Sequence, residues 1–154
     1  MRFYRHPELM EALRSKVDKD LKFVHVIRNP YDVLSTMTRR SPSKTLEINI
    51  ELFFKLCAGI AKLKRRLQPS QLFELRLESF IEQPKPHLTG LCAFLGVETN
   101  ERYLEDCASI VFKSPKKSRF DIPWDANSIS QVRERMEAFS FLSGYGFEVN
   151  GPHP

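Results

Sequence analysis

Long apolar runs are absent from this sequence of 154 residues. No stretch approaches the roughly 18 apolar residues that a membrane-spanning helix needs. Residues 1–15 also lack the apolar centre of a secretory signal peptide. The hydrophobic share of 42% is nevertheless that of a chain with an ordinary core. The length suggests one domain, and we expect it to span residues 1–154.

Cysteine is scarce, and the motifs of several enzyme classes are missing. The three cysteines, Cys57, Cys92 and Cys107, have no metal-like spacing, so we expect no metal site. No Ser-His-Asp set and no G-x-x-x-x-G-K loop is present. Free thiols in a reducing compartment are the default interpretation, and a Cys92–Cys107 bridge in a secretory lumen is the alternative.

Positive charge is in excess, with a net charge of +5 and a pI near 9.2. This balance favours anionic partners such as nucleotides, acidic glycans or nucleic acid. The basic residues gather around positions 39–44, 62–66 and 113–119. We interpret the middle group as a solvated helix end, where cations complement the helix dipole.

The most informative stretch is Lys22–Arg40. Its apolar, β-branched start predicts a buried strand that stops at Arg28. The next residues, Asn29, Pro30 and Asp32, are typical of a helix start. Since anions bind at helix starts near the carboxyl ends of strands, Arg28 is a candidate phosphate ligand. Ser35, about two turns into the helix, would add a hydroxyl; an ion pair between Arg28 and Asp32 is the structural alternative.

Periodicity predicts a mostly helical chain with few strands. We expect helices over residues 7–17, 30–39, 45–67, 86–95, 100–110 and 127–139, and strands over 22–27 and 72–77. Because a helix connects the two strands, they should be parallel. Residues 111–126 show no periodicity and are predicted to form a loop.

The segment KFVHVIRNPYDVLS resembles the 3′-phosphate-binding segment of sulfotransferases that use 3′-phosphoadenosine 5′-phosphosulfate (PAPS). The matching residues are Arg28, Asn29, Pro30, Asp32 and Ser35. Further pieces resemble the family in the same order, at Leu75–Glu98, Ser114–Trp124 and Phe141–Val149. The resemblance therefore covers nearly the whole chain.

The resemblance implies an α/β protein with the P-loop-like sulfotransferase fold, three layers around a parallel sheet. Here it would be reduced to the mostly helical carboxyl-terminal part. PAPS would be the co-substrate, without a metal, and the parent would transfer a sulfuryl group to a hydroxyl or amine acceptor. The basic loop would close over the 3′-phosphate through Lys117, Ser118 and Arg119, together with Arg28 and Ser35.

Two parts of the family's machinery have no clear match. The family holds the 5′-phosphosulfate in an upstream Lys/Ser/Thr-rich turn, which this sequence lacks. We therefore interpret the chain as a fragment or a degenerate member, and expect no sulfuryl transfer from these 154 residues alone. The catalytic base is unassigned: His6 lies in the family's region for it, but its place beside Pro7 favours a capping or incidental role.

The alternatives to a sulfotransferase are a non-catalytic nucleotide-binding or scaffold protein and a basic nucleic-acid-binding module. No aromatic-interleaved basic strand supports the second alternative.

Overall fold

The computed structural model describes Lys16 and residues 21–148. These residues form a mostly helical α/β fold around a two-stranded sheet, as predicted. The elements in chain order are β1 (Phe23–Ile27), α2 (Pro30–Arg40), α3 (Leu46–Lys64), η2 (Pro69–Gln71), β2 (Leu72–Arg76), α4 (Leu77–Glu82), α5 (Pro84–Leu95), α6 (Glu101–Ser109), η3 (Ser118–Phe120), α7 (Ala126–Met136) and η4 (Ser140–Leu142).

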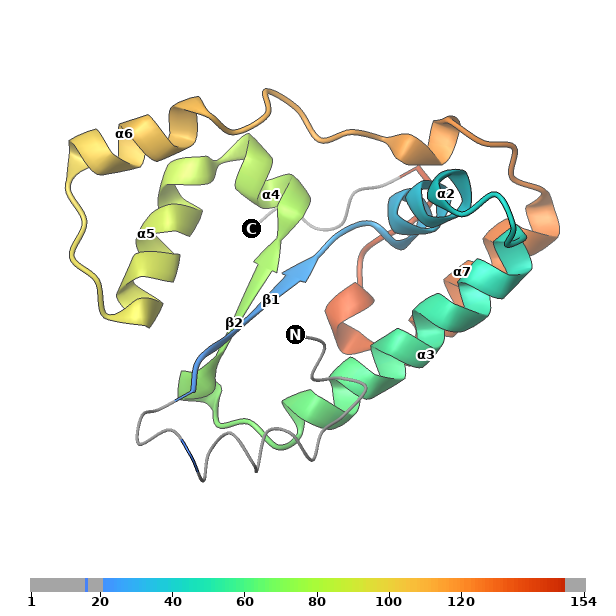
Figure 1. Ribbon diagram of the computed structural model, residues 1–154, viewed down its shortest axis with the longest axis horizontal. Coiled ribbons are helices and arrows are strands. Elements are labelled where there is room, and N and C mark those ends of the chain that lie inside the picture. The colour runs from blue at the N-terminus through green and yellow to red at the C-terminus, as the bar shows by residue number, and fades with distance from the viewer. Residues whose placement is uncertain (1–15, 17–20, 149–154) are drawn as a thin grey trace.

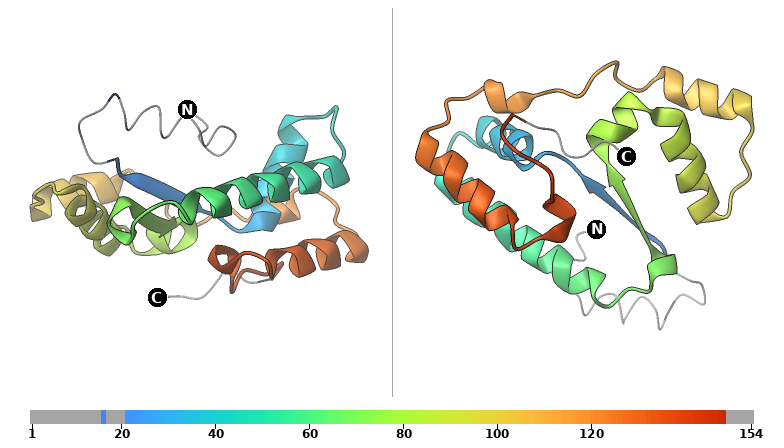
Figure 2. Two further views of the ribbon diagram at one scale, coloured as in Figure 1. Left: turned by 90° about the horizontal axis from the view of Figure 1, so that it is seen from below. Right: turned by 180° about the vertical axis from the view of Figure 1, so that it is seen from behind.

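The two strands pair in parallel, with Phe23 opposite Leu72 and Ile27 opposite Arg76. Helices α2, α3 and α7 lie on one side of the sheet in Figure 1, and α4, α5 and α6 lie on the other. Figure 2 shows α7 running alongside α3. Both strands therefore end at the junction between the two helical groups, where α2 and α4 begin.

The main core lies between β1, α2, α3, α7 and the carboxyl-terminal turns. Its buried members are Ile27, Tyr31, Leu34, Ile50, Phe53, Phe54, Cys57, Val132, Met136, Phe141, Leu142 and Tyr145. Burial raises the pKa of the Cys57 thiol to about 12, so this cysteine stays a neutral core residue. All three cysteines are free thiols.

Polar side chains and a glycine cap the helix ends. The Asn29 side chain accepts a hydrogen bond from the Tyr31 amide at 3.0 Å and caps α2. Asn100 caps α6 in the same way, through the Tyr103 amide at 2.9 Å. Gly96 ends α5 with a φ of 74°, a left-handed conformation that favours glycine. Within the described part of the chain, no helix is long and apolar enough to cross a membrane.

The region after β2 differs from the prediction. We expected a strand to Leu77 and a next helix beginning at residue 86, but Leu77–Glu82 forms helix α4 and Pro84 begins α5. Proline suits the first turn of a helix because its missing N–H would have no intrahelical partner there. Smaller differences are that α3 ends at Lys64 and that α7 begins one residue early, capped by Asp125. The predicted helix over residues 7–17 falls almost entirely outside the described residues.

Candidate functional site

Arg28 follows β1 directly and stands at the carboxyl end of the sheet. Its guanidinium donates hydrogen bonds to the carbonyl oxygen of Lys116 at 2.9 Å and to the hydroxyl of Ser118 at 3.0 Å. The strand end is thus tied to the predicted basic loop, 88 residues further along the chain. The alternative ion pair of Arg28 with Asp32 does not form, because Asp32 pairs with Arg119.

Asp32 and Arg119 form a fully buried ion pair beneath the loop. The Asp32 carboxylate accepts from the Arg119 backbone amide at 2.8 Å and from its guanidinium at 3.1 Å. The side chains are 2% and 0% exposed, so water does not screen the pair. Burial raises the pKa of Asp32, while the hydrogen bond and charge of Arg119 oppose that rise. The pair anchors η3 onto α2.

Glu78 holds the start of α2 from the other side. Its carboxylate accepts hydrogen bonds from the Asn29 amide and from the Tyr145 hydroxyl, both at 2.8 Å. Burial and the neighbouring Glu78 charge raise the pKa of Tyr145, which keeps its hydroxyl a donor. Glu78 thus contacts the start of α2 and takes a structural part at this site.

Ser35 lies inside the protein at 0% exposure. Its hydroxyl donates to the Tyr31 carbonyl oxygen at 2.8 Å and accepts from the Trp124 indole at 3.1 Å. Of the predicted site residues, Ser118 bonds Arg28 directly, whereas Arg119 bonds Asp32 and Ser35 does not contact Arg28 in these bonds. Ser35, Ser118 and Arg119 are all buried and bonded within the protein.

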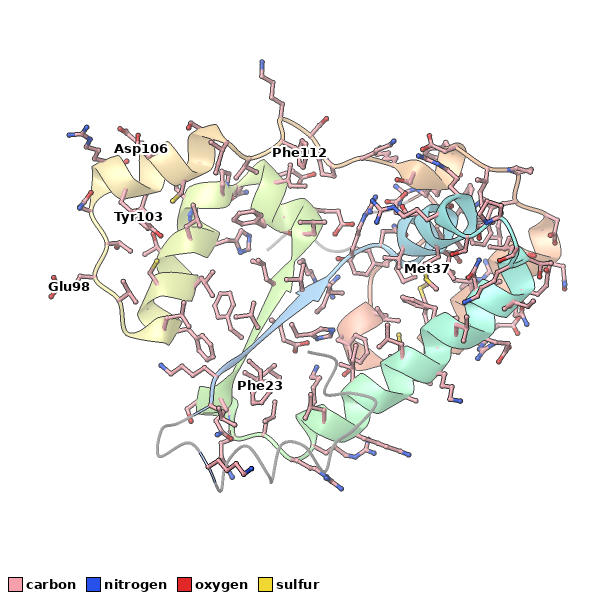
Figure 3. The ribbon with its side chains drawn as sticks, viewed as in Figure 1. Phe23, Met37, Glu98, Tyr103, Asp106 and Phe112 are labelled. Carbon is pink, nitrogen blue, oxygen red and sulfur yellow. The ribbon has the colours of Figure 1, made fainter. Side chains whose placement is uncertain are left out.

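A cleft of about 400 Å³ opens above these buried groups, between α2, α4 and the loop that precedes η3. Its lining residues are Arg28, Thr36, Arg39, Arg40, Leu77, Glu78, Ile81, Phe112, Ser114, Pro115, Lys116 and Ser118. Four of these are cationic: Arg28, Arg39, Arg40 and Lys116. Leu77, Ile81 and Phe112 give the cleft an apolar part, and Figure 3 shows Phe112 on the connection above α4.

The lining includes residues that the sequence analysis did not name as ligands. Lys116 lines the cleft, whereas Lys117, the predicted lysine, is exposed and precedes the first residue of η3. Thr36, Arg39 and Arg40 were also missed. Helical spacing offered the signal, because these residues follow Asp32 at one and two turns and so share its side of α2.

Neither of the two histidines in the described part of the chain, His25 and His87, lines this cleft. His25 bonds Glu74 at 3.1 Å and packs its ring edge against Phe141. His6, the residue in the family's position for the base, lies outside the described residues. Across Lys16 and residues 21–148, no group of three or more His, Cys, Asp or Glu side chains could hold a metal ion.

Residues 8–101 match the model of the sulfotransferase family. The chain belongs to this family. The solved structures that resemble this sulfotransferase-family fold include two sulfotransferase domains. One is from the curacin biosynthetic pathway, with a TM-score of 0.60 and 16% identity. The other is from the olefin synthase of Synechococcus PCC 7002, with a TM-score of 0.64 and 18% identity.

The likeness covers 88% of this chain in both cases but only 59% of the curacin-pathway domain and 55% of the olefin-synthase domain. The chain therefore spans little more than half the length of these sulfotransferase domains. No curated protein matches the sequence. At these identities the likeness establishes the fold, and the family match establishes the membership that the sequence pieces predicted.

Proposed function

We propose that this sulfotransferase-family chain binds PAPS through the cleft beside β1 and α2, for transfer of a sulfuryl group to a hydroxyl or amine acceptor in the full-length parent. The observation that favours this function is the position of Arg28. It stands at a strand end beside the capped start of α2, in a cleft with three further cations. Charge-assisted contacts of this kind suit a phosphate dianion.

The shape and chemistry of the cleft fit one end of such a nucleotide. Arg28, Arg39, Arg40 and Lys116 would face the 3′-phosphate, and the apolar residues Leu77, Ile81 and Phe112 would face the base. The bound PAPS would supply the activated sulfuryl group. The described residues would hold and orient the nucleotide. None of them is assigned as the base that removes the proton of the acceptor.

Among the predicted ligands, the buried residues take a supporting part in this proposal. Arg119 fixes the loop through Asp32, and Ser35 fixes Trp124 against α2. Ser118 positions the Arg28 guanidinium through its hydroxyl. Of the predicted ligands, Arg28 is then the one that contacts the phosphate itself, together with Arg39, Arg40 and Lys116. Lys117 would add charge near the loop without lining the cleft.

Calorimetric titration with adenosine 3′,5′-bisphosphate tests the proposal. Arg28→Ala should weaken binding by about ten- to a hundredfold, since a hydrogen-bonded contact to a charged group contributes on the order of 1.5–3 kcal/mol. Arg28→Lys should recover only part of this loss, because an ammonium lacks the guanidinium fork. Adenosine 5′-phosphate, which has no 3′-phosphate, should bind more weakly to the wild type.

Arg66→Ala is the matched control, because this substitution removes the same charge at an exposed position beyond the end of α3. Equal losses for Arg28→Ala and Arg66→Ala would indicate diffuse attraction rather than a site. A nucleic-acid-binding module would instead favour a single-stranded oligonucleotide over the bisphosphate, with a steep dependence on salt.

A further inference from the structure

Asp121 does not line the cleft itself, but its carboxylate contacts two of the cations that do. Its carboxylate bonds the Arg39 guanidinium and lies 3.3 Å from the Lys116 ammonium. Arg39 belongs to the last turn of α2, and Lys116 to the loop on the opposite side. One carboxylate therefore offsets part of the positive charge of two of the four cations that line the cleft.

The loop does not depend on Asp121 for its position. The buried Arg119–Asp32 pair and the hydrogen bonds of Arg28 to Lys116 and Ser118 already fix the loop against α2. The Asp121 contacts are by contrast solvent-exposed, with side-chain exposures of 48% for Arg39, 66% for Lys116 and 34% for Asp121. Exposed ion pairs of this kind contribute little to folding stability.

We infer that Asp121 is an internal counter-ion that competes with the phosphate of the bound nucleotide for Arg39 and Lys116. The inference rests on the proposed function, which places that phosphate in the cleft. A carboxylate held between two cations lowers the positive potential that an incoming anion meets. Asp121 thereby weakens the hold on the nucleotide and favours its release. It contacts no reacting atom and acts through the two cations.

The decisive variant is Asp121→Asn, which removes the charge and keeps the size of the side chain. We expect adenosine 3′,5′-bisphosphate to bind about three- to tenfold more tightly, and the gain to shrink as salt is raised. The matched control is Asp106→Asn, an exposed position on α6, at the far end of the molecule from α2. It makes the same change in net charge and should leave the affinity within about twofold of the wild type.

A further set of variants tests whether Asp121 acts through Arg39 and Lys116. In a protein that already contains Arg39→Ala and Lys116→Ala, adding Asp121→Asn should change the affinity by less than about twofold, because the carboxylate then has no cations to neutralise. A merely structural role for Asp121 would not depend on these two residues in this way.

The outcomes separate this inference from the proposed function. If Asp121→Asn binds the bisphosphate no better than Asp106→Asn, or binds it more weakly, Asp121 is not a competitor and the inference is overturned. If the wild type binds no bisphosphate, the proposed function fails, and inorganic pyrophosphate becomes the probe of the same cations. Tighter pyrophosphate binding by Asp121→Asn would then still support the counter-ion role, and unchanged or absent binding would refute it.

Discussion

Beneath the cleft, β1, α2, α4 and the η3 turn bury Asn29, Asp32, Ser35, Glu78 and Arg119. Helices α5 and α6, which lie wholly within the described residues, bury only Cys92 and Leu104. Polar and charged groups are unfavourable in a protein interior unless hydrogen bonds compensate them. Their concentration under the cleft shows that this region is built to hold a fixed arrangement, whereas α5 and α6 pack as simple amphipathic helices.

The charged contacts of the two regions differ in the same way. Asp32 and Arg119 are almost completely inaccessible to water, whereas Lys85 of α5 meets Glu101 and Glu105 of α6 at the surface. Removing one member of a buried pair leaves an uncompensated charge in the interior, while removing one member of an exposed pair leaves a charge in water. Substitutions in the two regions should therefore have very different effects on stability.

Asp32→Ala should have the largest effect. It leaves the Arg119 guanidinium and backbone amide buried without their carboxylate, and we expect unfolding to become easier by about 3–5 kcal/mol. Urea denaturation of the variant and the wild type measures the difference. The double variant Asp32→Leu with Arg119→Met should recover much of the loss, because it removes both charges. A single-variant loss below about 1 kcal/mol would show that the pair is not effectively buried.

The sequence predicted the elements better than it predicted this network. The apolar spacing in residues 46–64 located α3, and Asn29 marked the start of α2, because these signals are local. The contacts that shape the cleft join residues 87 and 88 positions apart, Arg119 to Asp32 and Lys116 to Arg28. No local pattern specifies such a pairing.

The same distinction explains the uneven prediction of the candidate site. Arg28 could be proposed from the sequence because a strand end before a capped helix is a local signal. The sequence showed that Lys116, Lys117 and Arg119 form a basic loop. Their spacing does not predict that Arg119 pairs with a buried carboxylate while Lys116 lines the cleft. Helix α4 was missed because Leu77 continues the apolar pattern of β2.

An intermediate effect on folding stability is expected at Glu74, a residue of β2 whose carboxylate contacts His25 and Lys64. The hydrogen bond with His25, aided by Lys64, lowers the pKa of Glu74 from 4.5 to about 2. A carboxyl group with a lowered folded-state pKa stabilises the protein above its unfolded value and loses this contribution as pH falls through the folded value. The loss should therefore occur between about pH 4.5 and pH 2.

Because the Glu74 side chain is 39% exposed, solvent screening should limit this contribution to about 1 kcal/mol. Urea denaturation across the acidic range should show that Glu74→Gln flattens the pH dependence relative to the wild type. Glu98→Gln is the control, since Glu98 is exposed in the connection between α5 and α6. Parallel pH profiles for Glu74→Gln and the wild type would mean that the hydrogen bond with His25 does not persist in solution.

The smallest effect on stability is expected at Lys85, which belongs to the exposed ion pairs between α5 and α6. Its contacts with Glu101 and Glu105 raise the pKa of its ammonium, yet all three side chains are well exposed. Water and salt screen the attraction in such contacts, and the side-chain entropy lost when the long side chains are held in place offsets the rest. Lys85→Ala should leave the urea midpoint unchanged within the error of the measurement, at low and at high salt. A clear loss of stability that disappears in salt would instead show that the α5–α6 packing depends on charge, and the contrast with the buried network would no longer hold.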